Sequence, residues 1–225
     1  MKKTILTLAI TTFASLSLHA NPEIPRVVAQ NFGEAVANGI LLLKGTGATS
    51  EPTEWTAFSR DAFRPEEILR ISVQMENAQW KATAAGAGSK ILSPAPSRKL
   101  DFTQVRERSA DARVVAAKAA ALAQTTFGSV DYQLASNEAT GVPEWALALK
   151  DETGYEVGFC VVSAATGALI FQDWTPRFAT ATPNQQGDGA RAAKNVKQTA
   201  RKAWNWTDKA RTETKGFFRE LFRKN

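Results

Sequence analysis

The sequence predicts an α+β protein made of two tandem modules, each a helix packed on a small antiparallel sheet, followed by a C-terminal amphipathic helix. Three observations support this fold class. Apolar residues alternate with polar or small ones in consecutive stretches of 142–174, the period of half-buried strands. An alanine-rich stretch at 110–126 precedes them and favours a helix. Two short sequence echoes suggest that a helix-plus-sheet unit occurs twice.

The first twenty residues have the layout of a secretory signal peptide. Met1-Lys2-Lys3 precedes an apolar run over 4–18, and His19-Ala20 forms a short exit. This run is shorter than the roughly 20 residues that span a bilayer as a helix. We therefore expect an exported bacterial protein, periplasmic or secreted, with a mature chain that begins near residue 21.

The first module is expected at 21–98. A helix is predicted over 25–43, although Gly33 and Gly39 weaken it and its end could instead be a strand. Strands follow at 54–61, 69–75 and 79–84, where apolar and polar residues alternate. The stretch 93–98, Ser-Pro-Ala-Pro-Ser-Arg, has the composition of an interdomain linker.

The second module is expected at 99–174. Ser109 suits the N-cap of the helix at 110–126, and Gly128 suits the exit from it. A strand is predicted at 129–135. A hairpin then follows within 142–161, and a third strand at 168–172 completes the module.

The echoes align the two modules. Arg-Val-Val-Ala at 26–29 recurs at 113–116, an offset of 87, and Glu54-Trp55 with Asp61 recurs as Glu144-Trp145 with Asp151, an offset of 90. The nearly equal offsets indicate an internal repeat.

The second module resembles the PepSY-like family of small exported bacterial domains. The resemblance rests on the alanine-rich helix, the strand Trp145-x-Leu147-x-Leu149-x-Asp151, and the closing Val-Ser-Ala-Ala-Thr-Gly-Ala-Leu of 162–169, where Ser163 replaces the aspartate common in the family. It implies a helix on an antiparallel sheet that acts as a non-catalytic binding or inhibitory module of the cell envelope, sometimes against peptidases. The family lends no catalytic residues.

Composition argues against an enzyme. The sole histidine, His19, lies in the signal, and Cys160 is the sole cysteine, so Ser-His-Asp, Cys-His and histidine–metal chemistry have no residues in the mature chain. Cys160 sits within an apolar strand, which favours a packing role. The carboxylate pairs at 66–67 and 151–152 fall in turns. We therefore expect no catalysis, no cofactor and no metal site.

Four residues of the paired strands suggest a ligand groove. Trp55 and Trp145 could line it, and Arg60 and Lys150 could anchor an acidic ligand. The alternatives are that both tryptophans belong to the core and that both cations are solvated edge charges.

Charge is concentrated at the C-terminal end. Residues 190–225 hold eleven Lys or Arg and three Asp or Glu, a net +8; the whole chain is +6, so 1–189 carries −2, and about −4 without Lys2 and Lys3. A Thr-, Pro-, Gln- and Gly-rich stretch at 175–189 predicts a disordered linker before a basic helix at 190–225.

On a helical wheel, the tail 190–225 is amphipathic. Its apolar stripe recurs at spacings of four and three: Val196, Ala200, Ala203, Thr207, Ala210, Thr214, Phe217 and Leu221.

Aromatic rings beside an apolar stripe, with cations opposite, are typical of a helix at an anionic membrane surface. Docking on the acidic body of the protein and a coiled coil are the alternatives. Nucleic acid ranks below them because the protein is expected to be exported. The residues predicted to contact membrane or partner are Trp204, Trp206, Phe217, Phe218, Leu221, Phe222, Lys197, Arg201, Lys215 and Arg219.

The sequence thus predicts a non-enzymatic envelope protein whose PepSY-like modules bind a protein or peptide partner while its tail contacts a membrane. The alternative is a secreted or periplasmic peptidase-inhibitor or chaperone-like module whose C-terminal helix docks on its own body.

Overall fold

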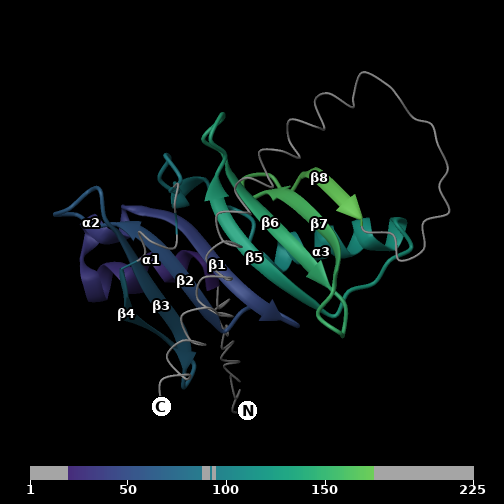
Figure 1. Ribbon diagram of the computed structural model, residues 1–225, viewed down its shortest axis with the longest axis horizontal. Helices are drawn as coiled ribbons and strands as arrows, with labels where there is room; N and C mark the ends of the chain where they lie inside the picture. The colour runs from purple at the N-terminus through teal and green to yellow at the C-terminus, as the bar shows by residue number, and fades with distance from the viewer. Residues whose placement is uncertain (1–19, 88–91, 93–94, 175–225) are drawn as a thin grey trace, which may run out of the picture.

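A computed structural model of the chain describes residues 20–87, 92 and 95–174 (Figure 1). The signal residues 1–19, the linker 175–189 and the basic tail 190–225 lie outside the described residues. Among the described residues, no helix is both long enough and apolar enough to cross a membrane.

The fold is built on one antiparallel sheet of eight strands, in the order β4-β3-β2-β1-β5-β6-β7-β8. Every neighbouring pair is antiparallel. The strands are β1 (Ile40–Ala48), β2 (Glu54–Arg60), β3 (Ile68–Glu76), β4 (Gln79–Ala87), β5 (Ser129–Ser136), β6 (Pro143–Lys150), β7 (Glu156–Ser163) and β8 (Leu169–Trp174). The helical elements are α1 (Ala20–Phe32), α2 (Glu34–Ala37), the 3₁₀ turn η1 (Phe102–Gln104) and α3 (Ser109–Leu122).

The prediction of two separate helix-on-sheet modules is wrong. Strand β1 pairs with β5 from Leu42↔Ala135 to Ala48↔Val130, so the strands of both halves form one continuous sheet (Figure 1). One hydrophobic core contains residues of both α1 and α3, including Ile24 and Ala112. The order of a helical segment followed by four antiparallel strands does occur twice, but within one sheet and over one core.

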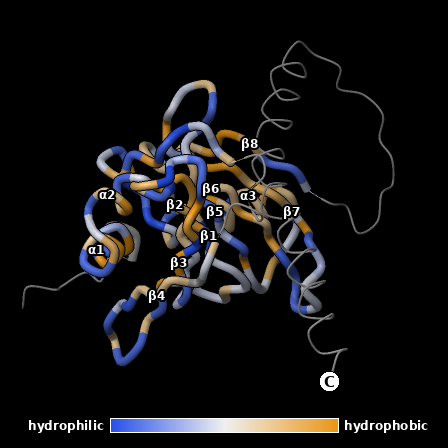
Figure 2. Tube along the Cα trace, turned by 60° about the vertical axis from the view of Figure 1, so that its left-hand side comes forward, coloured by the Kyte–Doolittle hydropathy of each residue, from blue (hydrophilic) through white to orange (hydrophobic). Residues whose placement is uncertain are grey.

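Both long helices pack on the same side of the sheet, which we call the helix face. Helix α1 packs against β3 and β4, and α3 packs against β6, β7 and β8. The other side of the sheet is called the opposite face. Figure 2 shows the hydrophobic segments gathered along the inner strands, with hydrophilic segments in the connecting loops.

The central position of β1 explains why its first residues were predicted to be the end of a helix. Residues 40–43, Ile-Leu-Leu-Leu, are all 0% exposed, and they are shared between the core on the helix face and a second cluster on the opposite face. A strand buried on both faces lacks alternation and cannot be distinguished by period from the end of a helix. The helix predicted over 25–43 instead stops at Phe32, because Gly33 adopts φ +90°.

The other strands and helix α3 agree closely with the elements predicted from the sequence. The strands expected at 54–61, 69–75, 79–84, 129–135 and within 142–174 are confirmed with small shifts of their ends. Helix α3 is confirmed but ends at Leu122, before Gln124 at φ 54°. Its N-cap is Arg108 rather than Ser109, and Asp111 accepts a hydrogen bond from the Arg108 backbone N–H at 3.0 Å.

The stretch after β4 lies against the sheet where the structure describes it. Leu92 and Leu100 are buried, and the Leu100 N–H donates to the Ile40 carbonyl at 2.8 Å. The Ser97 N–H donates to Glu138 Oε1 at 2.9 Å. This segment therefore connects the first half of the sheet to the β5–β6 hairpin.

Candidate functional site

The two tryptophans of the predicted groove lie in the core. Trp55 and Trp145 are each 0% exposed, and their ring centroids are 6.0 Å apart with an interplanar angle of 53°. Tyr132 lies 6.2 Å from the first ring and 6.4 Å from the second. Trp145 Nε1 donates to the Glu107 carbonyl at 2.9 Å. These rings therefore form the centre of the helix-face core and do not line an open groove.

The two cations of the predicted groove end β2 and β6, and each makes structural contacts of its own. Arg60 donates to the carbonyl oxygens of Pro65 and Pro96, at 3.1 and 3.3 Å. Lys150 forms an ion pair with Asp131, and their side chains are 13% and 2% exposed. The four residues are thus not brought together, since the rings pack in the core while each cation bonds to a different part of the chain.

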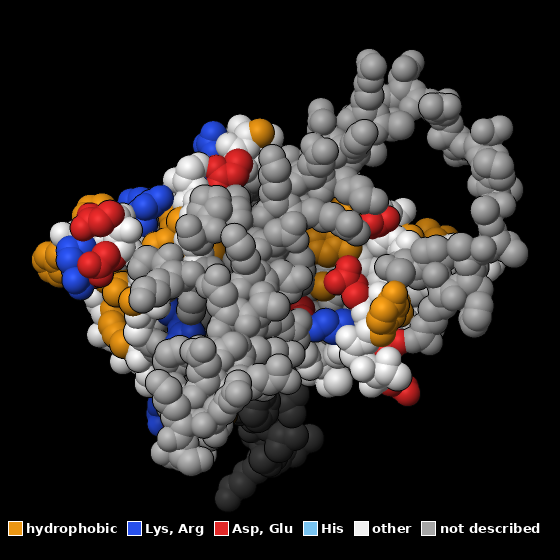
Figure 3. Space-filling model, viewed as in Figure 1, with side chains coloured by type: hydrophobic (Ala, Val, Ile, Leu, Met, Phe, Trp, Pro, Cys, Tyr) orange, Lys and Arg blue, Asp and Glu red, His pale blue; other side chains and the backbone are white. Residues whose placement is uncertain are grey.

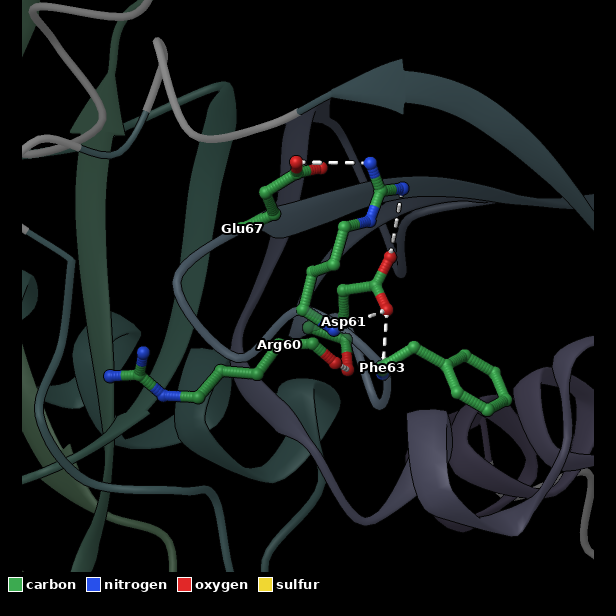
Figure 4. A network of polar contacts seen from close by, with 6 residues as sticks. Arg60, Asp61, Phe63 and Glu67 are labelled. Atoms are coloured by element: carbon green, nitrogen blue, oxygen red, sulfur yellow. Dashed lines mark hydrogen bonds and ion pairs between the residues drawn. The ribbon is translucent and has the colours of Figure 1, made fainter.

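Arg60 leads into a loop that is held by a network of polar contacts (Figure 4). Asp61 Oδ1 accepts from the backbone N–H groups of Phe63 and Arg64, at 2.8 and 3.1 Å. The Arg64 guanidinium bridges Asp61 and Glu67, at 3.4 and 3.0 Å. The Phe63 N–H bond is the main reason that the pKa of Asp61 lies below its ordinary value of 3.8.

Asp151, the echo of Asp61, also organises a loop. Its Oδ1 accepts from the backbone N–H groups of Thr153 and Tyr155, at 2.8 and 3.0 Å. Together with Thr126, Phe127 and Gly128, this loop borders a partly open cavity of about 300 Å³. Both aspartates therefore have a structural role as loop caps.

Cys160 is the free cysteine of the described residues and lies within β7. Cys160 is 0% exposed, and its burial raises the pKa of the thiol to about 12, so the reactive thiolate does not form at neutral pH. Within the described residues, no three His, Cys, Asp or Glu side chains gather as a metal site would require. Cys160 acts as a packing residue of β7.

Strand β8 exposes aliphatic side chains at one edge of the sheet. It is the last strand of the sheet, pairs with β7, and leaves Leu169 and Ile170 38% and 40% exposed. It contains no Lys or Arg, and its single charged residue is Asp173 near its C-terminal end. At the other end of the sheet, β4 carries Lys81, which pairs with Glu76 at 2.7 Å. Lys in particular protects an edge strand from pairing with another chain, whereas exposed apolar side chains do not.

An apolar cluster lies on the opposite face beside β8. Ala146 pairs with Val161, Ala148 pairs with Phe159, and Val161 pairs in turn with Phe171, which places all five side chains on one face as cross-strand neighbours. The rings of Phe159 and Phe171 lie 6.4 Å apart. We call these residues the opposite-face cluster: Ala146, Ala148, Phe159, Val161 and Phe171.

Neither feature was predicted from the sequence. A signal was present in 157–162, where Val-Gly-Phe-Cys-Val-Val is apolar throughout, which is typical of a strand buried on both faces. That β8 is an edge strand depends on pairing between distant segments, which no local pattern reveals.

The residues predicted to contact membrane or partner all lie outside the described residues, in 190–225. They are Trp204, Trp206, Phe217, Phe218, Leu221, Phe222, Lys197, Arg201, Lys215 and Arg219.

No protein-family model, curated protein or solved structure matches this chain. The resemblance of the second half to the PepSY-like family therefore stays a prediction.

Proposed function

We propose that this is an exported, non-enzymatic binding protein that captures an extended segment of a protein or peptide by adding it to the sheet beside β8. The observation that carries the proposal is an outer strand without Lys or Arg, in which Leu169 and Ile170 are partly exposed. Export is inferred from the signal-like layout of residues 1–20.

Strand addition uses the backbone groups on the outer side of β8, which is the last strand of the sheet. The outer side of an edge strand carries backbone N–H and C=O groups that can pair with an added strand, and these bonds supply affinity for many sequences. Side chains at alternate positions of the captured segment then supply specificity. Leu169 and Ile170 would favour a segment with apolar residues at such positions.

The strand is also well supported for this purpose. Its partner β7 has seven of its eight residues buried, and α3 packs behind both strands. Trp174 at the end of β8 packs against the main core. A pre-ordered edge of this kind lowers the conformational entropy lost on binding.

The test uses mature chain 21–225 and a displayed library of short random peptides as the probe. Peptides enriched on the wild-type chain are measured against Ile170→Lys, which puts a cation on β8, and against Thr83→Lys, the matched change on exposed edge strand β4. We expect Ile170→Lys to weaken binding roughly tenfold or more, about 1.4 kcal/mol, and Thr83→Lys to leave it unchanged.

Thermal unfolding of both variants checks that each is folded. The proposal fails if no peptide is enriched, or if the enriched peptides bind Ile170→Lys as well as wild type. Equal loss in both variants would also overturn it, since the two edges would then be equivalent.

A further inference from the structure

The opposite-face cluster is buried although neither long helix lies over it. Ala148, Phe159 and Val161 are 1%, 3% and 2% exposed, yet α1 and α3 both pack on the helix face. An apolar sheet face is stabilised when a second layer removes it from water. A further segment therefore belongs over this cluster.

Connectivity favours the tail as that segment. The 51 residues after Trp174 (225 − 174) leave the sheet from β8, the strand that contributes Phe171 to the cluster. As a flexible coil, the 15 residues of 175–189 reach about 21 Å, from roughly 5–6 Å × √n. The distance from β8 across to β5 is about 14 Å, three strand spacings of about 4.8 Å. The linker is long enough to bring the tail over the cluster.

The apolar pattern of the tail suits a sheet face. As a helix, 190–225 has one stripe with small residues at Ala200, Ala203 and Ala210 and large ones at Phe217 and Leu221. Small side chains permit close approach of a helix, and the large ones fill the remaining space. The cluster likewise combines two alanines with two phenylalanines.

Charge favours the same pairing. Asp173 lies directly across from Phe159, so a carboxylate shares the face with the apolar side chains, whereas Asp131, across from Ala148, is paired with Lys150. Figure 3 shows hydrophobic and acidic side chains side by side in the half of the molecule that holds β5–β8. The tail carries +8 and the mature body about −4, so the two attract each other at low and moderate ionic strength.

We propose that the C-terminal segment 190–225 docks as an amphipathic helix on the opposite face, over the cluster of β6, β7 and β8. This inference does not depend on peptide capture by β8. An anionic membrane and a second copy of the chain are the competing occupants, and each gives a distinct result in the test.

The test places a nitroxide spin label on the tail of the full mature chain. Asn205→Cys lies on the polar side of the predicted helix, and native Cys160 is buried with a thiol pKa of about 12, so labelling selects the introduced cysteine. We expect the label to broaden the backbone amide signals of β6, β7 and β8 and to leave those of β3 and β4 sharp.

Two controls separate the occupants. In a mixture of ¹⁵N chain without label and unenriched chain with label, intramolecular docking leaves the ¹⁵N signals sharp, whereas broadening of β6–β8 would assign the cluster to a second copy and overturn the proposal. The double change Phe217→Ser and Leu221→Ser should reduce the broadening, whereas the polar-side change Gln198→Ser should not.

The proposal is also overturned if the sheet shows no broadening in buffer. Binding of the same chain to phosphatidylglycerol vesicles would then identify the tail as a membrane element. Equal broadening across all eight strands would mean that the tail has no fixed site on the sheet.

Discussion

The two halves of the sheet place the same residue types at matching positions and give them different partners. Trp55 on β2 and Trp145 on β6 stack in one core, but Trp145 Nε1 bonds to the Glu107 carbonyl while Trp55 Nε1 is buried with no partner among the described residues. Arg60 bonds to two carbonyl groups, whereas Lys150 forms a buried ion pair. Matching strand positions thus preserve the apolar core while the polar contacts around it differ.

The two outer strands differ in the same way. Strand β4 carries a charge paired to β3 through Lys81 and Glu76 and supports α1. Strand β8 has no cation and exposes two aliphatic side chains. The first half ends in an edge that carries a lysine and the second in an edge with exposed aliphatic side chains, which is why the proposed peptide capture is placed in the second half.

The largest difference between the halves is expected from the two basic residues. Lys150→Ala leaves the carboxylate of Asp131 buried without its ammonium partner, which costs about 3–5 kcal/mol. Arg60→Ala removes two hydrogen bonds to carbonyl groups near the surface, at about 1 kcal/mol. Guanidinium unfolding of both variants measures this difference. Equal losses would show that Lys150 and Arg60 are equivalent after all.

A charge-removal control sharpens that result. The double change Asp131→Asn and Lys150→Met removes both charges and should recover part of the stability lost in Lys150→Ala, since a neutral pair has a smaller desolvation cost. No recovery would contradict the assignment of the loss to an unpaired buried charge, because the double variant has neither charge and methionine keeps most of the aliphatic stem.

The tryptophans give an intermediate effect. Trp55→Phe and Trp145→Phe remove similar volume from one core, but only the second also removes a hydrogen bond and leaves the Glu107 carbonyl without it. We expect Trp145→Phe to be more destabilising by about 1 kcal/mol, as measured by chemical unfolding. A larger loss for Trp55→Phe would contradict the idea that the orphan Nε1 of Trp55 is the less favourable arrangement.

Local patterns in the sequence predicted most strands but not how they assemble. Alternation identified β2, β3 and β6 because core residues of the helix face recur at every second position, as in Trp55 and Ala57 or Leu147 and Leu149. It failed at β1, which is buried on both faces, and so the pairing with β5 that joins the halves was missed. The sequence analysis predicted two sheets where the structure has one, because the pairing joins residues about 90 positions apart. A local hydrophobic period carries no information about pairing at that separation.

The echoes were informative for strands and misleading for helices. Trp55 and Trp145 are both buried, and Asp61 and Asp151 both cap loops. In contrast, Val27 is 3% exposed while its echo Val114 is 53% exposed, because α1 and α3 present different faces to the core. Alternation found the strands because it indicates which side chains are buried. It does not distinguish a side chain in the core from one that lines a pocket, and so the predicted tryptophan groove was wrong.

The smallest expected effect concerns the loop that Asp61 holds. The pKa of Asp61 lies below 3.8, first because of the Phe63 backbone N–H bond and further because of Arg64. A lowered carboxyl pKa means that ionised Asp61 stabilises the folded loop above its unfolded pKa, and that this contribution is lost as pH falls through the lower folded value. We expect the side-chain carboxyl signal of Asp61 in NMR to titrate with a midpoint below 3.8.

Substitution of Arg64 separates the causes of that shift. Arg64→Gln removes the guanidinium that favours the carboxylate and should move the midpoint of Asp61 upward, but not fully to 3.8, because the Phe63 N–H bond remains. A wild-type midpoint at or above 3.8 would show that the contacts of Figure 4 do not favour the ionised carboxyl. A midpoint that Arg64→Gln leaves unchanged would assign the whole shift to backbone N–H bonds, and Asp61 would then act only as a loop cap, as Asp151 does in the other half.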